Sequence, residues 1–128
     1  MTIEMKLLVW TALLTLGLAF VSVFAAMGQV GLAALAGNRE GLPELTGFAG
    51  RAVRTHRNAV ENLVLFAVVV LVAKQAGVSN ASTVLGAQLY FWGRVAHAGL
   101  YLAGVSWLRT AAFAVSTVGL LMIVLQLL

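Results

Sequence analysis

Apolar residues dominate four long stretches of the chain, and short polar or glycine-containing breaks separate these stretches. No charged residue lies between Lys6 and Arg39, an interval longer than the roughly 20 apolar residues that a membrane-spanning helix needs. Loops exposed to lipid cannot satisfy their backbone hydrogen bonds. We therefore predict one all-α membrane domain over residues 1–128, a four-transmembrane-helix bundle. Its spans are expected at about residues 7–36, 48–77, 81–104 and 107–128.

The composition supports lipid as the solvent for most of the exterior. Of the 128 residues, 62% are hydrophobic and 9% are charged, whereas a soluble domain carries roughly 25–35% charged residues on its surface. The chain has no cysteine, which excludes disulfides and thiolate metal sites, and two histidines are too few for a metal cluster. The net charge of +4 does not indicate nucleic-acid binding, because the basic residues are scattered between apolar runs.

The charges at the span ends predict an orientation. The first segment is too long for the 7–15-residue apolar core of a signal peptide, so we expect it to be a span. Four spans then place the first and third loops on one side and both termini on the other. The side with the first and third loops is rich in arginine, whereas the only basic residues on the side with the termini are Lys6 and Lys74. The positive-inside rule predicts cytoplasmic Arg-rich loops and termini on the outer side. The arginines concerned are Arg39, Arg51, Arg54, Arg57 and Arg109.

Polar and charged residues also recur within the second and third predicted spans. On the second, one helix face carries Arg51, Arg54, Asn58 and Glu61. On the third, one face carries Tyr90, Arg94, His97 and Tyr101. At 1.5 Å per residue, Glu61 lies about 20 Å along the second span from Phe48. Arg94 lies about 15 Å along the third span from its cytoplasmic end near residue 104. A charge near the bilayer centre costs at least about 2.5–3.5 kcal/mol. We therefore expect these side chains to face one another or a wet cavity.

A purely structural interpretation is open for the same residues. The arginines can anchor helix ends among lipid headgroups, and Glu61 can pair with Arg57 or Arg94 to lock two helices together. Polar residues on the first span are expected to form hydrogen bonds between helices: Thr15, Ser22 and Gln29. Small residues on the third span are expected to permit close helix approach: Gly86, Gly93 and Ala96.

The charge balance favours a ligand. Several arginines share the Arg-rich half with one deep carboxylate, Glu61. Guanidinium groups bind carboxylates in pairs of hydrogen bonds, and amide, imidazole and phenol groups add further contacts, so a small zwitterionic or polyanionic ligand fits. Residues 64–73 contain no polar side chain. A channel needs polar groups along its whole path, so we expect a blind pocket that opens to the cytoplasm.

The stretch Gly50-Arg51-Ala52-Val53-Arg54-Thr55-His56-Arg57-Asn58-Ala59-Val60-Glu61-Asn62 resembles the second-helix signature of the MAPEG family, the membrane-associated proteins of eicosanoid and glutathione metabolism. The pattern Arg94-x-x-His97-x-x-x-Tyr101, followed by Arg109, resembles the same family. The match is closest to its microsomal prostaglandin E synthase and glutathione transferase branch. The resemblance implies a homotrimer of four-helix subunits that binds glutathione between neighbouring subunits.

The resemblance also implies roles for individual residues. Those expected to hold glutathione are Arg39, Arg51, Arg54, Arg57, Asn58, Glu61, Arg94, His97 and Tyr101. Arg109 matches the arginine that stabilises the glutathione thiolate, and Thr110 stands where the prostaglandin branch has a serine. A guanidinium beside the sulfur favours the nucleophilic thiolate. The thiolate is then expected to attack a hydrophobic electrophile dissolved in the bilayer, and no metal is expected.

Two other functions are compatible with the sequence. One is a non-catalytic lipid-binding or scaffolding protein of the same fold, because a fold does not establish turnover. The other is a small transporter or channel with Glu61 as its ion site, which the apolar residues 64–73 count against. The hydrophobic second substrate, and the choice among conjugation, peroxide reduction and isomerisation, are not encoded in any recognisable pattern.

Overall fold

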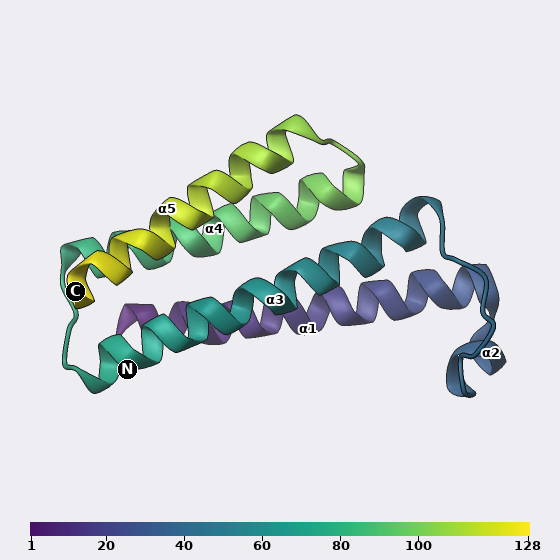
Figure 1. Cartoon of the computed structure of the whole chain (residues 1–128), viewed down its shortest axis with the longest axis horizontal. Coiled ribbons are helices and arrows are strands. Elements are labelled where there is room, and N and C mark those ends of the chain that lie inside the picture. Colours follow the sequence, from purple (N-terminus) through teal and green to yellow (C-terminus); the bar gives the residue numbers. More distant parts are fainter.

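Four long helices run antiparallel along a common axis, and a short fifth helix lies at one end (Figure 1). The computed structural model describes residues 1–128. Its helices are α1 Ile3–Val30, α2 Leu32–Ala36, α3 Gly47–Gln75, α4 Ala81–Ala103 and α5 Trp107–Leu127. Both termini lie at the end opposite α2 (Figure 1). The main pairs are α1 with α3 and α4 with α5, so the predicted all-helical architecture is observed.

Three of the long helices, α1, α3 and α5, are each long and apolar enough to cross a membrane. Helix α4 is about 34 Å long at 1.5 Å per residue, but it is less apolar because it carries Arg94 and His97. Both side chains are buried within the bundle, at 3% and 4% exposure. These two polar groups of α4 are thus directed at other helices, whereas its exposed face includes Leu85, Gln88 and Trp92.

The first long helix ends earlier in the chain than the sequence predicted. It ends at Val30 rather than near residue 36, because Gly31 adopts a left-handed φ of 88°. The chain then forms α2 before the loop to α3. The other three long helices begin and end within two residues of the predicted bounds.

Helix α4 has well-defined ends. At its start, Asn80 and Thr83 form a reciprocal capping box, with hydrogen bonds of 3.0 Å and 2.8 Å. At its end, Gly104 adopts a left-handed φ of 81° that terminates the helix. Arg51 of α3 donates from Nε to the Leu102 carbonyl oxygen at 3.1 Å. This contact places a cation at the negative end of the helix dipole.

Glycines allow α4 and α5 to pack closely, as predicted for Gly86 and Gly93. A Cβ atom on Gly86 would lie 2.6 Å from the Gly119 carbonyl oxygen of α5. A Cβ atom on Gly93 would lie 2.9 Å from Cβ of Ser116. Neither position therefore has room for a methyl group. Ala96, the third small residue of the prediction, is exposed and lines a hollow together with Ala112 and Val115 of α5.

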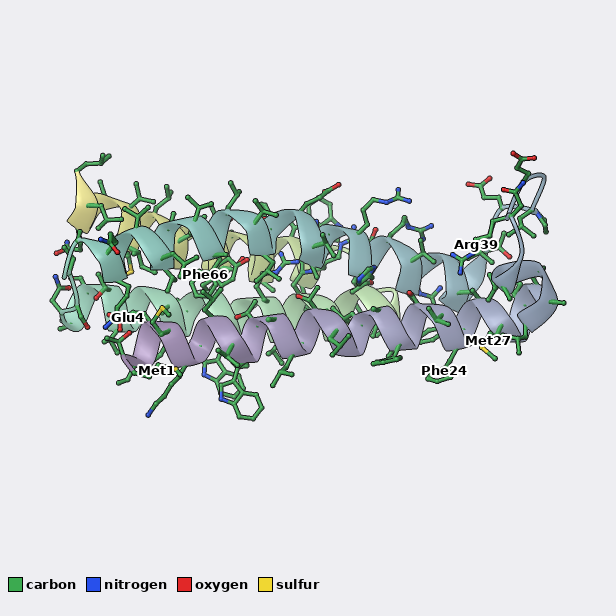
Figure 2. The ribbon with its side chains drawn as sticks, turned by 90° about the horizontal axis from the view of Figure 1, so that it is seen from below. Met1, Glu4, Phe24, Met27, Arg39 and Phe66 are labelled. Carbon is green, nitrogen blue, oxygen red and sulfur yellow. The ribbon has the colours of Figure 1, made fainter.

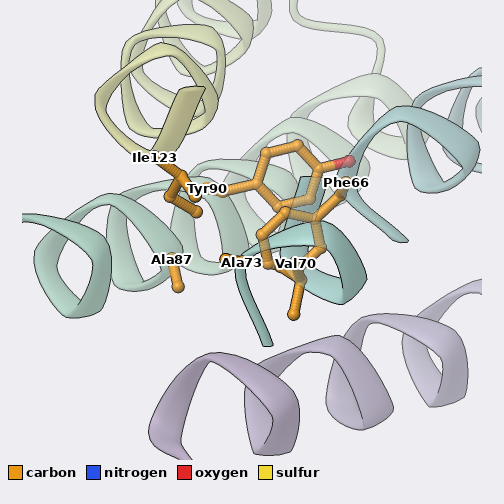
Figure 3. Packing of buried hydrophobic residues seen from close by; sticks show 6 residues of the cluster. All are labelled: Phe66, Val70, Ala73, Ala87, Tyr90 and Ile123. Carbon is orange, nitrogen blue, oxygen red and sulfur yellow. The ribbon is translucent and has the colours of Figure 1, made fainter. Parts of the chain in front are cut away.

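An apolar cluster fills the bundle between its polar ends (Figure 3). The rings of Phe66 and Tyr90 stack with centroids 4.0 Å apart. The other members surround these rings, and all six residues are at most 2% exposed. The full cluster consists of Phe66, Val70, Ala73, Ala87, Tyr90 and Ile123 (Figure 3).

Glu4 is a buried carboxylate that was not predicted from the sequence. Its side chain is 3% exposed near the end of the bundle that holds the termini (Figure 2). Thr83 donates to Glu4 at 2.5 Å and Ser79 donates at 3.0 Å. These bonds connect the first turn of α1 to the start of α4.

The hydrogen bonds expected from the polar residues of α1 form only in part. Thr15 donates to the Thr11 carbonyl oxygen and Ser22 to that of Ala19, so both bond within their own helix. Such bonds are typical of serine and threonine inside helices. Gln29 alone reaches another segment, where its amide exchanges hydrogen bonds of 3.1 Å and 2.9 Å with the backbone of Thr46.

Candidate functional site

A cavity of about 290 Å³ lies between α3, α4 and α5, in the half of the bundle that contains the arginines. Most of its lining residues were predicted as site residues, and they come from three different helices. The lining consists of Asn58, His97, Tyr101, Arg109, Thr110 and Phe113. Phe113 was not predicted, because one phenylalanine in an apolar helix carries no signal of a site. Its only cue is the spacing of one helical turn from Arg109.

Arg109 and the aromatic residues determine the geometry of this cavity. The Arg109 guanidinium lies over the Tyr101 ring, 4.3 Å from its centroid, which is a cation–π contact. The His97 ring meets Tyr101 edge-on at 5.7 Å and lies 6.3 Å from Phe113. Thr110 donates from its hydroxyl to the Ser106 carbonyl oxygen at 3.2 Å. The cavity thus combines one held cation, a hydroxyl group and aromatic walls.

Arg94 lies behind the cavity and contacts one of its walls. Its Nη2 donates to Oδ1 of Asn58. Asn62 donates to the Asn58 carbonyl oxygen at 2.9 Å, and Tyr90 donates to the Asn62 carbonyl oxygen at 2.9 Å. Asn62 also donates to Oδ1 of Asn58 at 3.4 Å, so the Asn58 side chain accepts hydrogen bonds from both Arg94 and Asn62.

Two buried polar atoms near the cavity have no protein partner, Nη1 of Arg94 and Nδ1 of His97. A buried polar group without a partner costs about 1–3 kcal/mol. Both atoms belong to residues that line the cavity or hold its wall. The polar character of this part of the bundle thus lies behind the lining of the cavity.

The remaining arginines of α3 do not line this cavity. Arg51 caps the end of α4, and its guanidinium lies 5.9 Å from the centroid of the Phe48 ring. Arg54 and Arg57 are exposed and line a separate hollow of about 220 Å³ that also includes Glu44. The α3 residues predicted to share one helix face thus point in different directions. Arg51 and Asn58 are directed at α4, whereas Arg54 is directed away from it.

Glu61 is exposed on α3, and neither ion pair considered for it is present. Its carboxylate forms no salt bridge with Arg57 of its own helix or with Arg94 of α4. The physical reason is that Arg94 turns inward to Asn58, whereas Glu61 and Arg57 project from the outside of the single chain. The structural lock between helices that the sequence left open is therefore absent from this chain.

Arg39 lies farther away, in the loop between α2 and α3. It lines a third cavity of about 240 Å³ beside α1, and none of the residues of this cavity belongs to the cavity around Arg109. Within one chain, the predicted site residues thus divide among the Arg109 cavity, the outside of α3 and this loop.

Comparison with known protein families identifies the family of this chain. A family model described as MAPEG matches residues 7–128, which is nearly the whole chain and includes all four long helices. The chain belongs to the MAPEG family. A search of curated proteins found no match.

Membership of MAPEG confirms two predictions at the level of the family. MAPEG proteins are four-helix membrane bundles, so the predicted fold class is confirmed, and this chain is a multi-pass membrane protein. Members of the family are glutathione-dependent membrane enzymes. The roles predicted for individual residues remain predictions.

Proposed function

We propose that this MAPEG protein is a glutathione-dependent membrane transferase or peroxidase. In this proposal, Arg109 stabilises the glutathione thiolate, and the thiolate attacks a hydrophobic electrophile that is dissolved in the bilayer. The observation that carries the proposal is the cavity of about 290 Å³ in which Arg109, Tyr101, His97 and Asn58 converge from three helices.

The chemistry of these residues fits glutathione. Glutathione carries carboxylates, an ammonium group and a thiol, so it needs cations, hydrogen-bond acceptors and a group that favours the thiolate. Arg109 provides the cation, and Asn58 and His97 provide amide and imidazole groups.

Arg109 and Thr110 are proposed to act at the sulfur. A guanidinium in a partly apolar site favours the thiolate over the thiol, and rotation would let the Thr110 hydroxyl donate to the sulfur in place of the Ser106 carbonyl oxygen. In a transfer, a thiolate lone pair forms a carbon–sulfur bond while the electron pair of the broken bond departs with the leaving group. In peroxide reduction, the thiolate attacks one peroxide oxygen, the O–O bond breaks, and the other oxygen leaves and is protonated to an alcohol. A second glutathione thiol then attacks the sulfenic acid, which forms the disulfide and releases water.

The proposal includes a homotrimer, because part of the predicted glutathione site lies on the outside of a single chain. Arg54, Arg57 and Glu61 are exposed on α3, and charged groups at membrane depth are expected to face protein or water and not lipid. A neighbouring subunit would cover them and bring its own Arg39 loop toward the Arg109 cavity. Arg51 would support the site indirectly through α4.

The proposed orientation places this cavity near the cytoplasm, where the Arg-rich loops are expected by the positive-inside rule. The spacing from Arg94 to Tyr101 supports a place near the prostaglandin E synthase and glutathione transferase branch. The nature of the electrophile is left to a substrate screen, since the apolar residues around the site carry no specific pattern.

The test is glutathione binding to the detergent-purified protein, measured by calorimetry and by the ultraviolet absorbance of the thiolate. We expect saturable binding with a thiolate signal in the wild type. Arg109→Ala should abolish the thiolate signal, the double variant Arg54→Ala/Arg57→Ala should lose binding, and Lys6→Ala, at the opposite end of the bundle, should match the wild type. Well-folded wild-type protein that binds no glutathione would contradict the proposal.

A second candidate is a non-catalytic lipid-binding protein of the same fold. An apolar hollow of about 390 Å³ on the outside of α4 and α5 favours it, with Leu85, Leu89 and Trp92 among its lining residues. This candidate predicts a lipid that copurifies with the chain and no binding of glutathione. The same calorimetric experiment, together with mass spectrometry of bound lipid, separates the two functions.

A further inference from the structure

The outward face of α4 carries two polar side chains that have no partner within the chain. Gln88 is exposed, and Trp92 is 63% exposed. Neither side chain takes part in a hydrogen bond. The other glutamines differ, because Gln29 and Gln126 form hydrogen bonds with the protein, and Gln75 is the last residue of α3. Gln88 is thus the only glutamine inside a long helix whose amide is unpaired.

Both side chains lie at membrane depth. At 1.5 Å per residue, Gln88 lies about 10 Å and Trp92 about 17 Å from Ala81, the first residue of a helix about 34 Å long. The hydrocarbon core of a bilayer is about 30 Å thick, and lipid tails offer no hydrogen bond. A glutamine amide at this depth therefore favours contact with a polar group of another helix. Tryptophan, for its part, is ordinarily enriched at the membrane surface and not at mid-span.

The hollow of about 390 Å³ between the outer sides of α4 and α5 includes both residues in its lining. Small residues leave this space open, namely Gly93 and Ala96 on α4 and Ala112 on α5. Small residues on a membrane helix let the backbone of a second helix approach closely. The hollow therefore has the shape and the unpaired polar group that a contact with another transmembrane helix requires.

This surface is complementary to itself, which favours a second copy of the chain as its partner. Copies inserted in the same direction present each residue at the same depth, so a twofold axis along the membrane normal places Gln88 opposite Gln88. A primary amide has both donors and an acceptor oxygen, so two such amides can exchange a reciprocal pair of hydrogen bonds. A phospholipid keeps its polar groups at the membrane surface and would leave the amide unpaired.

We propose that α4 forms a twofold contact between two copies of this chain. The two Gln88 amides pair at its centre, and the Trp92 side chain of each copy lies in the hollow of the other. The contact goes beyond the proposed function, because the hollow shares no lining residue with the Arg109 cavity. It also differs from the contact within the proposed trimer, which covers charged residues of α3. In a trimeric protein, the α4 contact joins two trimers.

Crosslinking in proteoliposomes tests the contact, and the absence of native cysteine makes it specific. Leu85→Cys places one thiol in the lining of the hollow, and a short bifunctional maleimide joins two such thiols. Thiols around a threefold axis can link at most about two-thirds of the chains into dimers, whereas a twofold contact can link nearly all of them. We expect Leu85→Cys to exceed this limit. Leu121→Cys, exposed on α5 near the same end of the bundle, should stay below it.

Gln88→Leu in the Leu85→Cys background tests the amide pair. It should weaken the association about tenfold, because each of the two hydrogen bonds between helices contributes roughly threefold. The measurement is the yield of linked dimer as the protein is diluted with lipid. Gln75→Leu removes an exposed amide at the end of α3, so this control should leave the yield unchanged.

A second pair of variants tests the hollow. Ala96→Phe fills it and should abolish the linked dimer. Ala103→Phe changes an exposed residue of the same helix outside the lining and should leave the yield unchanged. Both positions are exposed in the single chain, so both variants should keep the wild-type melting temperature.

A yield for Leu85→Cys that stays below the threefold limit, or one that neither Gln88→Leu nor Ala96→Phe lowers, would overturn the proposal. A lipid found in the hollow of unlinked protein would overturn it as well. Native mass spectrometry of the linked protein keeps this result separate from the proposed function. An even number of chains supports the contact whether or not glutathione binds, and an odd number contradicts it.

Discussion

At the scale of single residues, Asn58 is the point where the cavity meets the interior of the bundle. It lines the cavity and accepts hydrogen bonds from Arg94 at its side chain and from Asn62 at its backbone. We predict that Arg94 acts on the site through Asn58, as a positioning residue. The Asn62 amide also donates to Oδ1 of Asn58 at 3.4 Å, and these two side-chain contacts stabilise one rotamer of Asn58.

We expect Arg94→Met to weaken glutathione binding about tenfold or more, because a hydrogen bond to a charged group contributes about 1.5–3 kcal/mol. Methionine has a similar length but cannot donate to Asn58. Calorimetry measures the dissociation constant, and Lys74→Met, an exposed change at the other end of α3, is the control. An unchanged dissociation constant in folded Arg94→Met would remove the positioning role.

Residue spacing and the family resemblance together predicted which side chains lie near the cavity, but not how they are oriented. The five predicted residues that line it are Asn58, His97, Tyr101, Arg109 and Thr110. Helical periodicity assigned Arg54 and Asn58 to one face, yet Asn58 points to α4 and Arg54 points outward. That difference depends on how α3 is rotated against α4, which residue spacing within one helix does not contain.

At the scale of helices, the contact between α4 and α5 depends on glycines that have no room for a side chain. Gly93→Ala should lower the stability by about 1–3 kcal/mol, since overpacking forces the neighbouring atoms to move. The reason is the position of the new Cβ, 2.9 Å from Cβ of Ser116. Thermal unfolding in detergent measures this as a lower melting temperature.

Gly99→Ala in the same helix is the matched control. A Cβ atom there would have no atom within 4 Å, and alanine is favoured over glycine inside a helix by about 0.5–1 kcal/mol. The two variants should therefore shift the melting temperature in opposite directions. A shift in the same direction would show that helix propensity and not the close contact governs the stability of α4.

At the end of the bundle that holds the termini, the contact between α1 and α4 is polar and includes Glu4. Thr83→Val should lower the stability by about 1–3 kcal/mol, because the buried carboxylate loses its hydrogen bond of 2.5 Å from Thr83. Thr117→Val is the matched control, since the Thr117 hydroxyl bonds only to the Phe113 carbonyl oxygen of its own helix. Similar melting temperatures for both variants would contradict this role of Glu4.

The helices themselves were predictable from the sequence, since the apolar runs between polar breaks gave three of the four long helices to within two residues. The end of α1 was not. Gly17 and Gly28 continue the helix, whereas Gly31 adopts a positive φ and ends it. All three glycines stand in apolar surroundings, and only the return of the chain toward α3 determines which of them breaks the helix.

At the scale of the whole molecule, Arg39 lies at one end of the bundle and Met1 at the other (Figure 2). The absence of native cysteine allows single cysteines to report on the orientation. If the Arg-rich end is cytoplasmic, Glu40→Cys should react with an impermeant maleimide only after the cells are opened. Leu128→Cys, which is 98% exposed in the wild type, should react from outside intact cells. The reverse pattern would contradict the proposed orientation.

The stacked rings of Phe66 and Tyr90 also have an electrical consequence. Polar contacts continue from the cavity only as far as the Tyr90 hydroxyl, and the surrounding residues Val70, Ala87 and Ile123 are apolar and buried (Figure 3). Ions and protons need polar groups or water along their whole path. No charge is therefore expected to cross the bilayer during a reaction cycle. The rate should consequently be the same in polarised and depolarised vesicles, because a transmembrane voltage does work only on charge that moves across it.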